Sequence, residues 1–83
     1  MESYRTVCEA VTIRIKQLLE ENKMTLYKLA QDSGVLYDTL KKIVANKNKA
    51  VNLAVAIQIA GGFNMTLAEF VDVPIFNEDN LKL

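Results

Sequence analysis

The 83-residue sequence contains ten basic and ten acidic residues, so its formal net charge is zero, and 51% of its residues are hydrophobic. This length and composition predict one small domain with its own core and leave no room for a second. Without histidine or a glycine-rich phosphate loop, the sequence lacks the commonest acid–base group and phosphate cradle, so we expect no enzymatic activity, cofactor or metal.

The first predicted helix begins after Thr6 and frays near Glu21 and Asn22. Thr6 and Glu9 have the spacing of a capping box, in which each side chain bonds the other residue's backbone N–H. The expected buried stripe follows a helical period and consists of Val7, Val11, Ile15, Leu18 and Leu19. Cys8 is expected to be a small buried or half-buried apolar group rather than a reactive thiol.

Two short helices joined by a tight turn are predicted between residues 25 and 44. Thr25 can cap the first helix, and Gly34 can take the positive φ that ends it sharply. The expected buried side chains are Leu26, Leu29 and Ala30 in the first helix, and Leu36, Leu40, Ile43 and Val44 in the second. The side chains expected on the outside of the second helix are Tyr37, Asp38, Lys41 and Lys42. This arrangement is typical of the helix-turn-helix that reads DNA grooves.

Two further helices are predicted after a polar loop over residues 45–49. Asn52 can cap the fourth helix, and Gly61–Gly62 should stop it. Its expected apolar positions are Leu53, Ala56, Ile57 and Ala60. Thr66 and Glu69 form a second capping box at the start of the fifth helix. The expected buried side of this helix consists of Leu67, Phe70 and Val71.

The last eleven residues, 73–83, form an apolar tail after the expected helix-turn-helix domain of residues 1–72. Pro74 prevents a simple continuation of the fifth helix. The tail carries large apolar groups, which are Ile75, Phe76, Leu81 and Leu83. They are too apolar for a plain disordered end. The tail therefore either folds back over its own domain or helps to cover a dimer partner, and the sequence leaves both possibilities open.

The charges are unevenly distributed along the chain. Residues 23–49 contain six lysines and two aspartates, a net charge of plus four, whereas residues 66–83 contain four carboxylates and one lysine, a net charge of minus three. A basic segment can be no more than a solvated surface. Combined with the helix spacing, it is better interpreted as a modest phosphate-facing surface.

Several short runs have the order and spacing of a known family of regulators. They are residues 14–25, 28–30 and 33–35, the residues Thr39, Leu40, Ile43 and Ala60, and residues 65–70 at the place of the family's fifth helix. Over roughly residues 7–72 the sequence resembles the phage repressor and Cro family, also called XRE-type regulators. The resemblance implies an all-α, five-helix lambda-repressor-like domain. It also implies a transcriptional regulator, expected to be a repressor, that binds a double-stranded DNA operator as a homodimer.

In the family, the first turn of the third helix meets base edges in the major groove. Matching position to position, Tyr37, Asp38 and Lys42 are the expected base-reading residues. Lys42 can donate to guanine O6 and N7, or it can be a surface lysine paired with Asp38. Asp38 can accept from a cytosine amino group, or it can simply favour the positive end of the helix dipole. Tyr37 can bond a phosphate, contact a thymine methyl group or be a partly exposed aromatic residue.

A second set of residues matches the family's phosphate contacts. Thr25 and the free N–H groups at the start of the second helix match its phosphate anchor. Thr39 matches a position where a hydroxyl often meets phosphate, although it can equally be an ordinary helix residue. The cationic candidates are Lys28, Lys41, Lys47 and Lys49.

The sequence departs from the family pattern at three places. Leu26 stands where a glutamine often braces base recognition, and Leu36 replaces the usual capping residue or proline before the third helix. Ala45–Asn46 replaces the usual Asn-Gly turn after that helix. These changes bear on DNA affinity more than on the fold.

Two other functions remain compatible with the sequence. A helix-turn-helix bundle can bind a protein, as an antitoxin or anti-repressor would, and the zero net charge, Leu26 and the apolar tail support that alternative. A five-helix packing domain without a DNA role is a third possibility. The sequence contains no apolar run that approaches a membrane span and no signal-like start, and its single cysteine cannot form an internal disulfide, so we expect a cytoplasmic protein.

Overall fold

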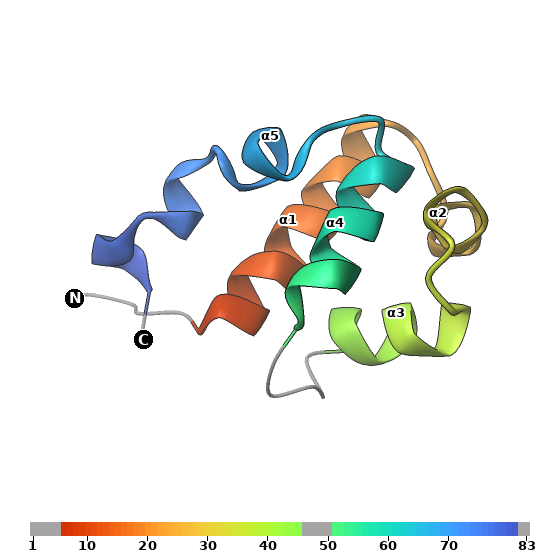
Figure 1. Cartoon of the computed structure of the whole chain (residues 1–83), viewed down its shortest axis with the longest axis horizontal. Helices are drawn as coiled ribbons and strands as arrows, with labels where there is room; N and C mark the ends of the chain where they lie inside the picture. The colour runs from red at the N-terminus through yellow and green to blue at the C-terminus, as the bar shows by residue number, and fades with distance from the viewer. Residues whose placement is uncertain (1–5, 46–50, 82–83) are drawn as a thin grey trace.

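The computed structural model describes residues 6–45 and 51–81, which form five α-helices and two 3-10 turns (Figure 1). The helices are α1 (Val7–Glu21), α2 (Leu26–Ser33), α3 (Tyr37–Val44), α4 (Leu53–Gly62) and α5 (Leu67–Val71), and the turns are η1 (Pro74–Phe76) and η2 (Glu78–Asn80). The predicted all-α, five-helix fold is confirmed. In the described part of the chain, no helix is both long enough and apolar enough to cross a membrane.

The ends of the helices follow the predicted capping residues. At the start of α1 the Thr6 hydroxyl accepts from the Glu9 N–H at 3.1 Å, and the Glu9 carboxylate accepts from the Thr6 N–H at 2.8 Å. Thr66 and Glu69 repeat this pair at the start of α5. Gly34 ends α2 with a φ of 76°, the left-handed conformation that favours glycine. Each cap satisfies backbone groups that the helix itself leaves without partners.

The helices enclose one core. α3 packs against α1 and α2, and α4 packs against α2 and α5. The largest fully buried side chains are Phe70, Ile15, Leu29, Leu40 and Ile59. Burying one such side chain contributes about 1.5–3 kcal/mol, so this cluster supplies much of the driving force for folding.

A glycine permits the close contact between α2 and α4. A Cβ atom built on Gly62 would lie 2.8 Å from Cδ1 of Leu29 and 2.9 Å from Cβ of Ser33. Real Cβ atoms do not approach carbon atoms so closely, so only a residue without a side chain fits between the two helices. Gly61 has no such neighbour within 4 Å.

The predicted inner face of α4 is wrong for two of its four residues, whereas Ala60 is buried and Ala56 is half-buried. Leu53 is 64% exposed and Ile57 is 50% exposed, whereas Ile59 is fully buried. The reason is that α4 is apolar nearly all round, with the sequence LAVAIQIAGG, so no polar face marks the side that meets solvent. The helix also runs through the two glycines that were expected to stop it, and Asn64, with a φ of 59°, follows in the left-handed conformation.

Two helix-terminal valines also differ from the predicted burial. Val7, the first residue of α1, is 42% exposed, and Val71, the last residue of α5, is 38% exposed. The end of a helix has fewer neighbours on its open side, so an apolar residue there keeps part of its surface in solvent. The remaining members of the predicted α1 stripe are buried or half-buried, and Cys8 is buried.

Arg14 is buried and links α1 to α5. Its Nε donates to the carbonyl oxygen of Phe70 at 2.7 Å, and its Nη2 donates to the carbonyl oxygen of Glu69 at 3.3 Å. Its guanidinium carbon also lies 5.9 Å from the centroid of the Phe70 ring. These carbonyls belong to the last turn of α5, where backbone acceptors lack helical partners and the dipole favours a cation.

The C-terminal residues up to Leu81 continue as η1 and η2, and η1 contacts α1. Phe76 packs against the core, and its ring centroid lies 6.2 Å from that of Phe70. Figure 1 shows these turns at one end of the molecule and α2 and α3 at the other. The predicted loop residues 46–49 and the apolar Leu83 lie outside the described residues.

Candidate nucleic-acid interface

The helix α3 is held in place by its inner face. Leu40 is fully buried and Ile43 is 3% exposed, so both side chains anchor the helix in the core. The buried Thr12 hydroxyl of α1 donates to the carbonyl oxygen of Ile43 at 2.6 Å. This bond satisfies one of the acceptors at the end of α3 that the helix itself leaves free. These contacts therefore fix the orientation of α3 and of its outer face.

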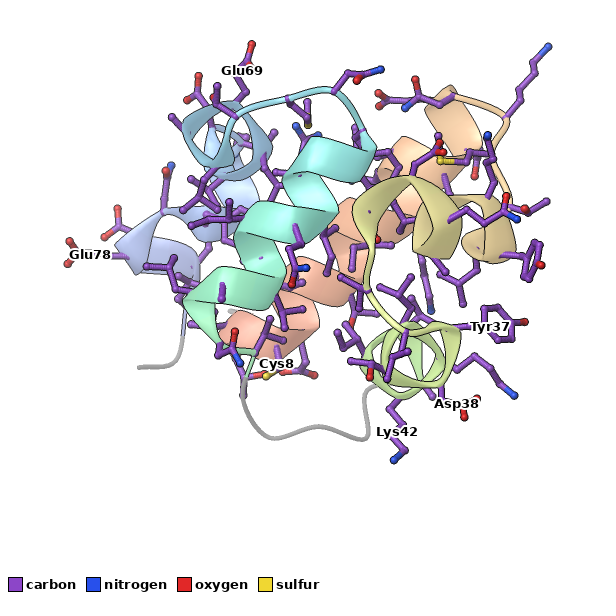
Figure 2. All side chains as sticks on the ribbon, turned by 45° about the vertical axis from the view of Figure 1, so that its right-hand side comes forward. Cys8, Tyr37, Asp38, Lys42, Glu69 and Glu78 are labelled. Carbon is purple, nitrogen blue, oxygen red and sulfur yellow. The ribbon has the colours of Figure 1, made fainter. Side chains whose placement is uncertain are left out.

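The outer face of α3 carries polar and cationic side chains, as predicted. Tyr37, Asp38, Lys41 and Lys42 are all exposed. Figure 2 shows Tyr37, Asp38 and Lys42 projecting from α3 away from the rest of the molecule. Among residues 6–45 and 51–81, the structure records no ion pair for Asp38 or Lys42. The Lys42 ammonium is therefore available to an outside acceptor.

Tyr37 lies between two neighbours that restrict its ring. The Tyr27 ring of α2 meets it in an edge-to-face arrangement, with centroids 6.0 Å apart and planes inclined by 72°. The Lys41 Nζ lies 5.5 Å from the centroid of the Tyr37 ring, a cation–π contact. Tyr27 could not be predicted from the sequence as part of this site, because its position beside Tyr37 depends on the angle between two helices.

The exposure of Leu36 contradicts the prediction that it is buried. It was expected in the buried stripe of α3, but it is 75% exposed. It precedes the first helical residue, with φ −59° and ψ 137°, so the helical period that buries Leu40 does not apply to it. It also makes no side-chain cap for α3. A large apolar side chain thus stands in solvent at the start of the proposed reading helix.

The described members of the predicted phosphate-contacting set are Thr25 at the start of α2, Lys28 in α2, and Thr39 and Lys41 in α3. The Thr25 hydroxyl caps α2 by accepting from the Lys28 N–H at 3.1 Å. The Lys28 Nζ forms an ion pair with Asp32 at 3.2 Å. Thr39 is half-buried, and Lys41 is exposed. Lys47 and Lys49, which contribute two of the six lysines in residues 23–49, lie outside the described residues.

Two acidic side chains near the C-terminus lie away from this face. Figure 2 shows Glu69 and Glu78 on the side of the molecule opposite to Tyr37, Asp38 and Lys42. Glu69 and Glu78 are therefore separated in space from Lys42. A polyanion approaching α3 meets Lys41 and Lys42 without passing these carboxylates.

Comparisons with known proteins agree with this geometry. A family model described as "Cro/C1-type HTH DNA-binding domain" matches residues 14–74. The crystal structure of the prophage Lp1 protein 11 superimposes with a TM-score of 0.77 at 20% sequence identity, over 89% of this chain and 97% of that one. No curated protein matches the sequence. Since the family match covers most of the chain and includes α2 and α3, the protein belongs to the Cro/C1-type helix-turn-helix DNA-binding family.

Proposed function

We propose that the protein is a sequence-specific transcriptional regulator of the cytoplasm that represses genes by occupying a double-stranded DNA operator as a homodimer. Residues 1–72 are the DNA-binding domain in this proposal, and α3 enters the major groove. The base-reading residues are Tyr37, Asp38 and Lys42. The phosphate-contacting residues are Thr25, Lys28, Thr39, Lys41, Lys47 and Lys49.

The observation that supports this proposal is the difference between the buried inner face and the exposed cationic outer face of α3. Its inner face is fixed by Leu40, Ile43 and the Thr12 hydrogen bond, while Lys42 points outward with no ion pair in the described structure. Base recognition requires donors held in a defined position, because a bidentate contact discriminates between bases only when its geometry is maintained. A rigid helix with a free cation in its last turn meets that requirement.

The substitution Lys42→Ala tests the reading role. If Lys42 contacts a base edge, the variant should lose about 1–3 kcal/mol of binding free energy on the preferred operator. It should also lose discrimination at one base pair, because the lost donor recognised that pair. The measurement is competition binding of the full chain against a randomised duplex library, followed by titration on the selected operator.

Lys28→Ala is the matched control, since it removes the same charge from the neighbouring helix. A phosphate contact carries no sequence information, so this variant should weaken all duplexes alike and lower the slope of log affinity against log salt by about one. Equal losses with unchanged sequence preference would exclude α3 as the reader. If both variants bind DNA like the parent, neither lysine contacts it; if the parent itself selects no duplex, the antitoxin or anti-repressor alternative replaces the proposal.

The proposed dimer seam lies on the apolar surface around the start of α4 and the end of α5. Leu53, Ile57 and Val71 are exposed there, and a hollow of about 230 Å³ is open beside them. The hollow is lined by Val7, Val11, Val51, Leu53, Ala56, Leu67, Phe70, Val71 and Phe76. Exposed apolar side chains around an apolar hollow favour association with another surface. The packing of Phe76 against the core supports a tail that folds back beneath this seam.

The variant Leu53→Glu should weaken dimerisation, because it places a charge in the apolar seam. Sedimentation of the full chain at several concentrations measures the effect. Leu36→Glu is the control, since it adds the same charge to an exposed leucine at the start of α3, outside the hollow. Unchanged assembly of Leu53→Glu would place the interface elsewhere.

A further inference from the structure

An apolar patch stands in solvent at the start of α3, on the helix that carries the proposed reading residues. It consists of Leu36, Tyr37 and Tyr27, which are 75%, 42% and 61% exposed. Leu36 and Tyr37 are neighbours in sequence, and the Tyr27 ring meets the Tyr37 ring edge-to-face. These three residues are called the entry patch below.

Within the entry patch, the Leu36 side chain contributes little to the structure of the free protein. Leu36 occupies the position before α3, where a Ser, Thr, Asp or Asn side chain would accept a hydrogen bond from the helix, and it provides no such bond. Since it is mostly exposed, it also buries little apolar surface. Its side chain is therefore available for a contact that forms only when a partner is present.

The surroundings of the patch indicate what kind of partner it meets. The exposed ammonium groups of Lys41 and Lys42 lie on the next turn of the same helix and outnumber the exposed Asp38 carboxylate, so this face favours a polyanion. The major groove of DNA offers one apolar feature to such a helix, which is the C5 methyl group of thymine. An aliphatic side chain that precedes a helix with these cations is thus suited to a methyl group displayed between two phosphate backbones.

We propose that Leu36 is a specificity-determining residue that reads a thymine C5 methyl group in the operator. This inference rests on the proposed function and names the base feature that α3 recognises at its start. Tyr37 forms the other wall of the methyl contact, and its ring is held between Tyr27 and Lys41. Tyr27 is a positioning residue, because it acts through Tyr37.

The test uses the full chain and an operator selected from an unmodified duplex library. Each thymine of the operator is replaced in turn by deoxyuridine, which removes the methyl group and keeps the base pair. Loss of one methyl contact should weaken binding of the parent protein about fourfold at one thymine per half-site, the equivalent of one buried methylene group. Leu36→Ala should bind the thymine operator more weakly and should no longer distinguish thymine from deoxyuridine at that position.

Leu53→Ala is the matched control, because it truncates an exposed leucine at the start of α4 rather than α3. If Leu53→Ala weakens assembly, it should lower the affinity for the thymine and deoxyuridine operators alike. The ratio of the two affinities should then equal that of the parent protein. Tyr27→Ala should reduce that ratio only in part, since Leu36 remains.

Three results would overturn the proposal, and they are distinguishable. If the parent protein binds every deoxyuridine operator as tightly as the thymine operator, methyl reading is wrong while DNA binding stands. If Leu36→Ala keeps the parent's full sensitivity to deoxyuridine, another residue is the reader. If the parent selects no duplex from the library, the proposed function itself fails and the entry patch is better explained by a protein partner.

Discussion

Leu40→Ala should remove a large part of the stability of this domain. Leu40 is fully buried in the core cluster that also contains Leu29 of α2 and Ile15 of α1. Truncating a buried leucine costs about 2–5 kcal/mol, because the core loses apolar burial and gains a cavity. Domains of this size have an unfolding free energy of about 4–12 kcal/mol. A thermal melt of the variant should therefore fall by about 8 °C or more.

Leu36→Ala is the matched control for this melt. It deletes the same atoms from a leucine four residues earlier, but from a side chain that is 75% exposed. Substitutions at exposed positions usually change stability by no more than about 0.5 kcal/mol, so its melting temperature should stay close to that of the parent. A Leu40→Ala protein that melted like the parent would show that Leu40 does not face the core.

Gly62→Ala should destabilise the protein, whereas Gly61→Ala should not. A Cβ on Gly62 would meet both the Leu29 side chain and the Cα of Ser33, the latter at 3.2 Å, so α2 and α4 would have to move apart. Overpacking of this kind typically costs about 1–3 kcal/mol. A Cβ on Gly61 meets nothing within 4 Å, and alanine is preferred to glycine in a helix by about 0.5–1 kcal/mol.

Chemical denaturation of the two variants measures this difference directly. Both changes add one methyl group to α4, at adjacent positions, so their effect on the unfolded chain is nearly the same. The expected result is a lower denaturation midpoint for Gly62→Ala and an unchanged or higher one for Gly61→Ala. Equal midpoints would mean that α2 and α4 are not in close contact at Gly62.

The parts of the fold that could be predicted from sequence are those determined locally. The capping boxes at Thr6 and Thr66 and the left-handed turn at Gly34 depend on residues three or four positions apart, and all three are confirmed. The face of α4 could not be predicted in this way. Its residues are apolar on every side, so only the position of its neighbours decides that Ile59 is buried and Leu53 is exposed.

The candidate site likewise has features that could be predicted from the sequence and features that depend on how the helices pack. Leu40 and Ile43 have helical spacing and are both buried, so they determine which side of α3 meets solvent. The exposure of Lys42 on that side was therefore predictable. The contact of Tyr27 with Tyr37 was not, because it depends on how two helices meet. Leu36 was misplaced because helical spacing was extended to a residue that precedes the helix.

The buried Arg14 couples the stability of α5 to that of α1. Its guanidinium lies in α1, and the Phe70 carbonyl that accepts from it is 56 residues further along the sequence. A five-residue helix such as α5 is too short to persist alone in water. If α5 detached, the fully buried Phe70 would leave the core and the guanidinium would exchange its carbonyl acceptors for water. We therefore expect α5 to unfold together with α1 in one cooperative step, rather than to detach alone.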